Sequence, residues 1–180
     1  MDSEDHVDAA AAAGRSADEI ASVLRERGCL DGECTAEVQA WLAEAAALLG
    51  PVAPDRGTLV DLLSLVFHYD AKTLLQSPDH HAVMVRNGAR DVIRALANEV
   101  LCGPEINSDR YKAMIAVLKG TLDCRGRELF HPIRMALAGR AGEGELDRVI
   151  LLLDSATKLP FRVPVKGTRQ RMLEFCAALE

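Results

Sequence analysis

The stretch 126–139, GRELFHPIRMALAG, places a lone arginine inside an apolar run that contains a proline and ends at a glycine. Proline is tolerated in the first turn of a helix, because no helical bond needs its missing N–H there, and glycine is a common helix terminator. The spacing therefore predicts a short helix from about Pro132 to Gly139. Arg134 would then lie in the first turn, where a cation opposes the helix dipole. Such an arginine needs a carboxylate partner or a function.

Two interpretations of Arg134 stay open at this point. The side chain could pair with Glu128 or Asp147, or its planar fork of donors could serve a binding function. His131 is the nearest candidate for a general base, but no nucleophile or carboxylate accompanies it at short spacing, so a structural role is the simpler interpretation. The chain also has no glycine-rich phosphate-binding loop. We therefore expect no catalytic residue, no cofactor and no small-molecule substrate.

Five cysteines, at positions 29, 34, 102, 124 and 176, form no framework of paired spacings. An odd number without such a framework predicts free thiols. Cys29 and Cys34 are the single close pair, and the histidines are scattered, so no metal site is expected.

The charge is unevenly distributed along the chain. The net charge of −6 argues against indiscriminate binding to nucleic acid. Residues 119–180, however, carry 11 basic and 8 acidic residues, so a polyanion would meet the C-terminal third. No apolar run approaches the ~20 residues that span a bilayer. The acidic N-terminus does not resemble a signal peptide. We expect a cytoplasmic protein without a membrane partner.

The elements that must position these residues have helical spacing throughout, and only 161–165 weakly suggests a strand. An all-α fold is predicted, an antiparallel bundle or cage of about seven to eight helices. Residues 1–14, acidic and rich in alanine, are expected to form a disordered tail. The expected helices cover 16–27, 35–49, 59–75, 78–100, 108–122, 132–139, 145–154 and 165–179.

The extended stretch 126–154 resembles the C-terminal anticodon-binding region of bacterial glutamyl-tRNA synthetase, a class I enzyme. That family's pattern runs roughly Gly-x-x-Leu-Phe-x-Pro-Leu-Arg-x-Ala-Leu-Thr-Gly. Segments 16–28, 55–70 and 92–101 resemble further helices of the same region. This chain matches the pattern at Gly126, Leu129, Phe130, Pro132, Arg134, Ala136, Leu137 and Gly139.

The resemblance implies a stand-alone helical chain without the catalytic domain. The His-Ile-Gly-His and Lys-Met-Ser-Lys-Ser motifs of the family's catalytic half are absent, so we do not expect an enzyme. Residues 15–77 and 78–180 would form a first and a second anticodon-binding-like subdomain.

The resemblance also implies which residues contact RNA. Lys119 could instead be a solvated charge and Leu146 an ordinary core residue, and Glu143 departs from a family loop that is often rich in Gly and Pro. Arg140, Arg125 and Arg127 could supply phosphate contacts. The expected RNA-binding residues are Arg134, Lys119, Arg56, Glu143, Gly144, Leu146 and Arg140.

The leading hypothesis is a non-catalytic tRNA-binding domain that recognises the anticodon arm of a glutamate- or glutamine-type tRNA, as an accessory to aminoacylation. The alternative is a protein-interaction or regulatory module on a synthetase-derived scaffold that has lost RNA binding and docks on a synthetase or another protein. A third interpretation is a detached or degenerate segment of a full synthetase.

Overall fold

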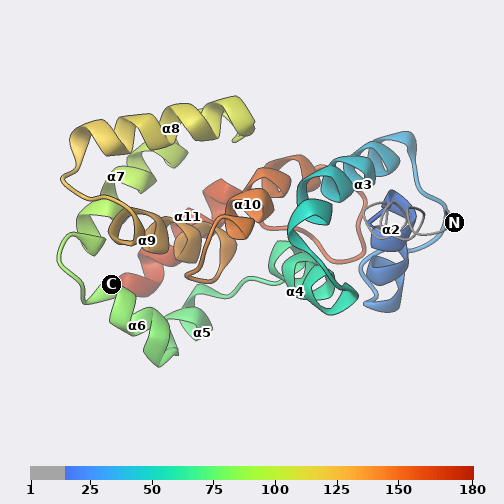
Figure 1. Ribbon diagram of the computed structural model, residues 1–180, viewed down its shortest axis with the longest axis horizontal. Coiled ribbons are helices and arrows are strands. Elements are labelled where there is room, and N and C mark those ends of the chain that lie inside the picture. Colours follow the sequence, from blue (N-terminus) through green and yellow to red (C-terminus); the bar gives the residue numbers. More distant parts are fainter. Residues whose placement is uncertain (1–14) are drawn as a thin grey trace, which may run out of the picture.

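The computed structural model describes residues 15–180, and in this range every regular element is a helix, as the predicted all-α fold requires (Figure 1). The predicted tail, residues 1–14, lies outside the described residues. Helices α2, α3 and α4 occupy one end of an elongated molecule, α5 to α9 occupy the other, and α10 lies between them. None of the helices in residues 15–180 is long and apolar enough to cross a bilayer.

The elements are α2 (Ala17–Glu26), α3 (Ala36–Leu49), the 3-10 turn η1 (Gly50–Val52), α4 (Arg56–Phe67), α5 (Ala71–Gln76), α6 (Pro78–Met84), α7 (Ala89–Cys102), α8 (Ser108–Thr121), α9 (Arg127–Ala138), α10 (Glu145–Ala156) and α11 (Thr168–Leu179).

Side-chain N-caps fix five of the ten α-helix starts in residues 15–180. Ser16 and Thr35 accept hydrogen bonds from backbone N–H groups three residues later, which confirms the predicted starts of α2 and α3. Asp55 caps α4 in the same way. Helix α8 begins at Ser108, the predicted start, and Asn107 caps it by accepting from the Arg110 N–H at 2.8 Å.

The single helix predicted over 59–75 is wrong, because the chain forms two helices there. Helix α4 ends at Phe67, residues 68–70 are not helical, and Asp70 caps α5 by accepting from the Thr73 N–H at 3.1 Å. Tyr69 lies in this break and donates its hydroxyl to the Ala136 carbonyl at 2.6 Å. The break lets the tyrosine reach the core.

The helix predicted over 78–100 is also two helices, α6 and α7. The turn between them ends at Gly88, which has a left-handed φ of +82°. A Cβ atom at Gly88 would lie 3.0 Å from the Cys124 sulfur. Glycine is therefore required at this corner both for its backbone conformation and for space.

Helix α9 begins at Arg127 and not near Pro132, so the predicted start is wrong, whereas the end at Gly139 is confirmed by a left-handed φ of +88°. Pro132 lies inside the helix, where it removes a bond to the Glu128 carbonyl. Glu128 is exposed, so water can bind that carbonyl. Arg134 consequently lies in the second half of α9, and the argument from the dipole of a helix start does not apply to it.

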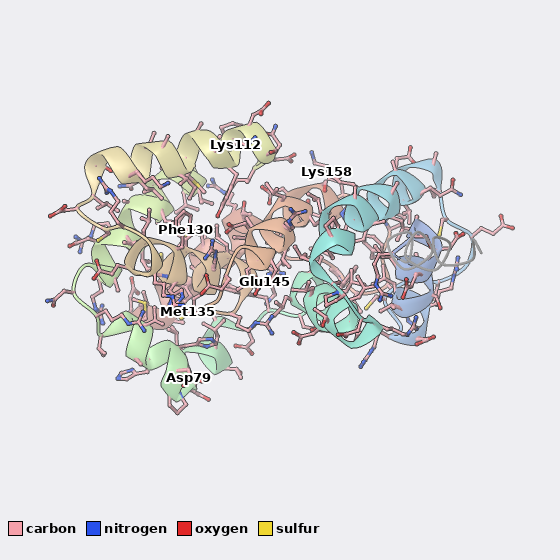
Figure 2. All side chains as sticks on the ribbon, in the orientation of Figure 1. Asp79, Lys112, Phe130, Met135, Glu145 and Lys158 are labelled. Atoms are coloured by element: carbon pink, nitrogen blue, oxygen red, sulfur yellow. The ribbon has the colours of Figure 1, made fainter. Side chains whose placement is uncertain are left out.

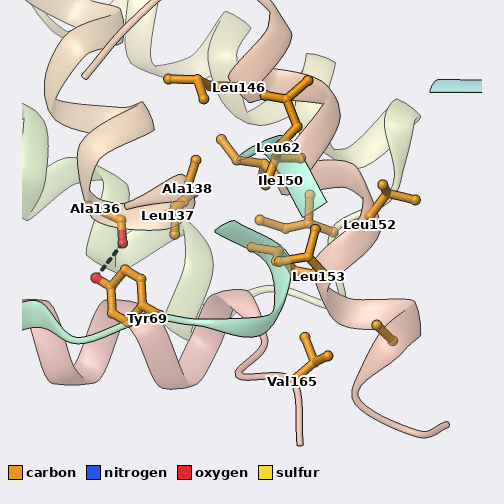
Figure 3. Packing of buried hydrophobic residues seen from close by; sticks show 14 of the residues in the cluster. Leu62, Tyr69, Ala136, Leu137, Ala138, Leu146, Ile150, Leu152, Leu153 and Val165 are labelled. Carbon is orange, nitrogen blue, oxygen red and sulfur yellow. Dashed lines mark hydrogen bonds between the residues drawn. The ribbon is translucent and has the colours of Figure 1, made fainter. Parts of the chain in front are cut away.

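One buried apolar cluster runs through the described residues, from Ile20 to Phe175. Helix α10 packs on α3, α4 and α9, and α11 packs on α5, α7 and α9. Figure 3 shows Leu62 of α4 beside Ile150 and Leu153 of α10. The division into 15–77 and 78–180 stays a prediction, with α10 in contact with helices on both sides of it.

An aromatic group completes this core at the α3–α4 end. Trp41 packs edge-on against Phe67 and Phe161, with ring centroids 6.1 and 5.1 Å away. The Trp41 indole N–H donates to the Leu152 carbonyl at 3.2 Å. The tryptophan thus links α3 directly to the backbone of α10.

Candidate nucleic-acid interface

Arg134 joins α9 to the start of α10 through a two-pronged ion pair. Its Nε and Nη2 each donate to one carboxylate oxygen of Asp147, both at 2.9 Å, and its Nη1 donates to the Gly142 carbonyl at 2.8 Å. The Arg134 side chain is only 9% exposed. Burial acts to lower the pKa of Arg134, but the hydrogen bond and charge of Asp147 outweigh it and the pKa is raised. The arginine therefore fixes the loop 139–144 to the helix before it.

Two aromatic residues surround this pair. The Tyr111 hydroxyl, from α8, donates to Asp147 at 2.7 Å, and burial followed by the Asp147 charge raises the pKa of that hydroxyl. The Phe130 ring lies 4.6 Å from the Arg134 guanidinium carbon and 5.5 Å from the Lys119 Nζ. Both cations are within cation–π distance of one ring. Side chains of α8 thus reach both α9 and α10 around the Arg134–Asp147 pair.

Exposed cations border the same loop. Arg127 pairs with Glu143 at 3.3 Å, and Arg140 pairs with Asp61 of α4 at 2.7 Å. Both pairs are well exposed to solvent. Exposed ion pairs contribute only about 0–1 kcal/mol, so a competing anion can displace the carboxylates at little cost.

The remaining predicted site residues have different environments. Leu146 is fully buried, which is the core position that its helical spacing indicates. Gly144 is exposed and directly precedes α10. Arg56 begins α4 and pairs with Glu26 of α2 at 2.8 Å, so its ion-pair partner is not one of the loop residues. The RNA contacts of all seven residues stay predictions.

His131 lies beside the α6–α7 turn. Its Nδ1 is 3.3 Å from Nη1 of Arg86, and its Nε2 is buried without a hydrogen-bond partner. Burial, and then the charge of Arg86, lower the pKa of His131. A histidine that stays neutral and accepts from an arginine is consistent with the structural role expected for it.

Sequence reasoning missed a fully buried arginine near the C-terminus. Arg171 donates to the carbonyls of Leu65 and Val66 at the end of α4 and of Leu137 at the end of α9. Burial lowers its pKa to about 10. One signal for it was available, since Arg171 shares a helix face with Phe175, four residues on.

Asp154 is a second buried polar residue that the sequence did not reveal. Its carboxylate accepts from the backbone N–H groups of Ile106 and Thr168, both at 2.7 Å, and from the Thr168 hydroxyl. It therefore caps α11 from α10. Within residues 15–180, no three His, Cys, Asp or Glu side chains gather closely enough to bind a metal ion.

Sequence comparison relates the chain to glutamate–tRNA ligases. It is 30% identical over 102 residues to glutamate–tRNA ligase 2 of Syntrophus aciditrophicus (strain SB), a match covering 57% of this chain and 21% of that protein. It is 25% identical over 136 residues to the glutamate–tRNA ligase of Bacillus subtilis (strain 168), covering 76% of this chain and 28% of that protein. The Bacillus licheniformis ligase matches at the same identity and covers 27% of its own length.

The chain thus spans between about a fifth and just over a quarter of the curated relatives that it matches. No family model matches the chain. No solved structure matches it. The relationship supports a synthetase-related helical domain.

Proposed function

We propose that the chain binds the anticodon arm of a glutamate- or glutamine-type tRNA and catalyses no reaction by itself. The sequence relationship to glutamate–tRNA ligases supports this proposal. The observation that carries it is the meeting of α8, α9 and α10 around the Arg134–Asp147 pair, with Lys119 and Arg134 both beside the Phe130 ring.

In this proposal the residues act in two ways. Arg134 is a positioning residue, because its bonds to Asp147 and Gly142 set the shape of the loop that faces RNA. Lys119 and Arg140 supply charge for phosphates, and Arg140 exchanges Asp61 for the nucleic acid. The exposed Gly144 leaves room for bases to approach the loop backbone.

The test measures binding of the full 180-residue chain to labelled glutamate tRNA and to an anticodon-swapped control, at 50 and 200 mM salt. Binding should weaken when the anticodon is changed and when salt is raised. Lys119→Ala should make the dependence of affinity on salt concentration shallower, by the amount expected for the loss of about one phosphate contact. The absence of binding at 50 mM salt, from protein that is folded and helical, would overturn the proposal.

Lys158→Ala is the matched control for Lys119→Ala. Lys158 is an exposed lysine that pairs with Glu105 at 2.7 Å. It follows the C-terminal end of α10, whereas the loop 139–144 precedes the N-terminal end of that helix. A 12-residue helix is about 18 Å long, and Figure 2 shows Lys158 well away from Phe130. Equal losses of affinity in the two variants would contradict recognition at the loop.

One observation favours the alternative function, a protein-interaction module. Arg127, Arg134 and Arg140 each already have a carboxylate partner within the chain. A scaffold that no longer meets RNA would need such internal partners. This function predicts that the folded chain binds a purified glutamate–tRNA ligase and that anticodon changes in added tRNA have no effect.

A further inference from the structure

Arg86 lies in the turn between α6 and α7 and faces the second turn of α9. Its Nη1 is 3.3 Å from Nδ1 of His131. A guanidinium stays protonated, so the arginine donates and Nδ1 accepts, which leaves the histidine proton on Nε2. His131 therefore orients the Arg86 side chain while Arg86 itself remains exposed.

Arg127, a second exposed arginine, begins α9 four residues before His131, so the two side chains share one face of the helix. After burial, the charges of Arg86 and Arg127 both act to lower the pKa of His131, and the charge of Glu143 acts in the opposite direction. In Figure 1 the α6–α7 turn and the turn leading into α9 lie at the same end of the molecule. Two cations are thus concentrated beside one neutral ring.

Glu143 is the carboxylate that pairs with Arg127. The two atoms are 3.3 Å apart, and the side chains are 64% and 76% exposed, so the pair is weak and readily exchanged. An RNA backbone phosphodiester carries the same single charge as this carboxylate, but its two non-bridging oxygens can each contact a different arginine, and successive phosphates along the backbone add to the attraction.

We propose that Arg86, which contacts His131, and Arg127, one helical turn before His131 on α9, form a phosphate-binding surface for an RNA backbone, and that Glu143 competes with the phosphate for Arg127. The proposal rests on the tRNA binding proposed above. It extends the RNA-binding surface from the loop 139–144 across the first turns of α9 to the α6–α7 turn. His131 is a positioning residue here, since it acts through Arg86.

The first test is Arg86→Ala in the full chain, measured with the same tRNA at 50 and 200 mM salt. Raising the salt from 50 to 200 mM lowers affinity by about threefold for each phosphate contact. The loss of affinity over this range should therefore be about threefold smaller for Arg86→Ala than for wild type. Arg94→Ala is the matched control, because Arg94 is an exposed arginine whose partner, Asp91, lies one turn away on α7. The control should keep the wild-type salt dependence.

The second test should change affinity in the opposite direction. Glu143→Gln removes the carboxylate that competes for Arg127, so affinity for tRNA at 50 mM salt should rise about threefold. Affinity should also depend more steeply on salt concentration, by the amount expected for one added phosphate contact. Glu105→Gln removes an equally exposed carboxylate from Lys158, and binding should not change. All four substitutions are on the surface, and a helical far-UV spectrum checks that each variant folds.

The outcomes separate the two proposals. One outcome would overturn this surface alone. Binding would depend on the anticodon and on Lys119, but Arg86→Ala would bind as its control Arg94→Ala does. Glu143→Gln would likewise bind with the same affinity as its control Glu105→Gln. Failure of wild-type protein and Glu143→Gln to bind tRNA at 50 mM salt would overturn the proposed function itself.

Discussion

Arg171 of α11 and Tyr69, from the break between α4 and α5, donate to adjacent carbonyls at the C-terminal end of α9. The Tyr69 hydroxyl binds the Ala136 carbonyl at 2.6 Å, and Nη1 of Arg171 binds the Leu137 carbonyl at 3.0 Å. The guanidinium carbon also lies 4.7 Å from the tyrosine ring. Because the last carbonyls of a helix have no partner within it, these two side chains satisfy the end of α9 inside the core. Figure 3 shows the bond from Tyr69 to Ala136.

Arg171→Met should destabilise the protein strongly. Methionine keeps a long apolar side chain but leaves the buried carbonyls of Val66 and Leu137 without this donor, at about 1–3 kcal/mol each. Urea denaturation should show a loss of about 3 kcal/mol or more in the free energy of unfolding. Arg169→Met is the control, because that exposed arginine reaches only the Leu101 carbonyl and should cost less than about 1 kcal/mol. Equal losses in the two variants would contradict the role given to Arg171.

Asp154→Asn should loosen the start of α11. The amide replaces one accepting oxygen by a donor, so the N–H of either Ile106 or Thr168 loses its partner in the interior. The expected loss is about 1–3 kcal/mol in the free energy of unfolding. Asp91→Asn, at an exposed first-turn position of α7, should cost less than about 0.5 kcal/mol. A thermal or urea melt of Asp154→Asn that matches wild type would refute this assignment.

Arg134 and Asp147 should be energetically coupled. A double-mutant cycle with Arg134→Met and Asp147→Ala should give a coupling of about 1–3 kcal/mol in unfolding, since the pair is largely buried and charge-assisted. The same cycle on Arg127 and Glu143, which are exposed, should give about 0–1 kcal/mol. Similar couplings for the two pairs would mean that Arg134 does not position the loop.

His131 should make stability depend on mildly acidic pH. Burial, and then Arg86, lower its folded-state pKa, so below about 6.5 the unfolded chain binds more protons than the native one. The free energy of unfolding should therefore fall as the pH falls from 7.5 to 5.5. His131→Gln, which can still accept from Arg86, should lose less over this range. Parallel pH profiles of melting temperature for wild type and His131→Gln would rule this out.

The helix ends that local chemistry decides were predictable from the sequence. Ser16 and Thr35 cap α2 and α3, and Gly139 ends α9, because each acts through its own backbone neighbours. The break at 68–70 was not predictable in this way. It is maintained by the bond from Tyr69 to Ala136, which is 67 residues away in the chain.

The candidate site shows the same limit. The spacing marked Arg134 as unusual but left Glu128, Asp147 and RNA as possible partners, and only the return of α10 against α9 selects Asp147. Pro132 misled the prediction of the start of α9, because an exposed carbonyl at Glu128 lets the proline stay inside the helix. Long-range packing decided the partner of Arg134, whereas solvent exposure at Glu128 allowed the proline inside α9.

The bond from Trp41 to Leu152 has a consequence for how the chain is made. The two residues are 111 positions apart, and α10 is the helix on which α3 and α4 both pack. At 5–20 residues per second, a ribosome needs roughly 5–20 s to synthesise the intervening chain. Over that interval the apolar faces of α3 and α4 have no α10 to cover them, so this part of the nascent chain exposes apolar surface until α10 has been synthesised.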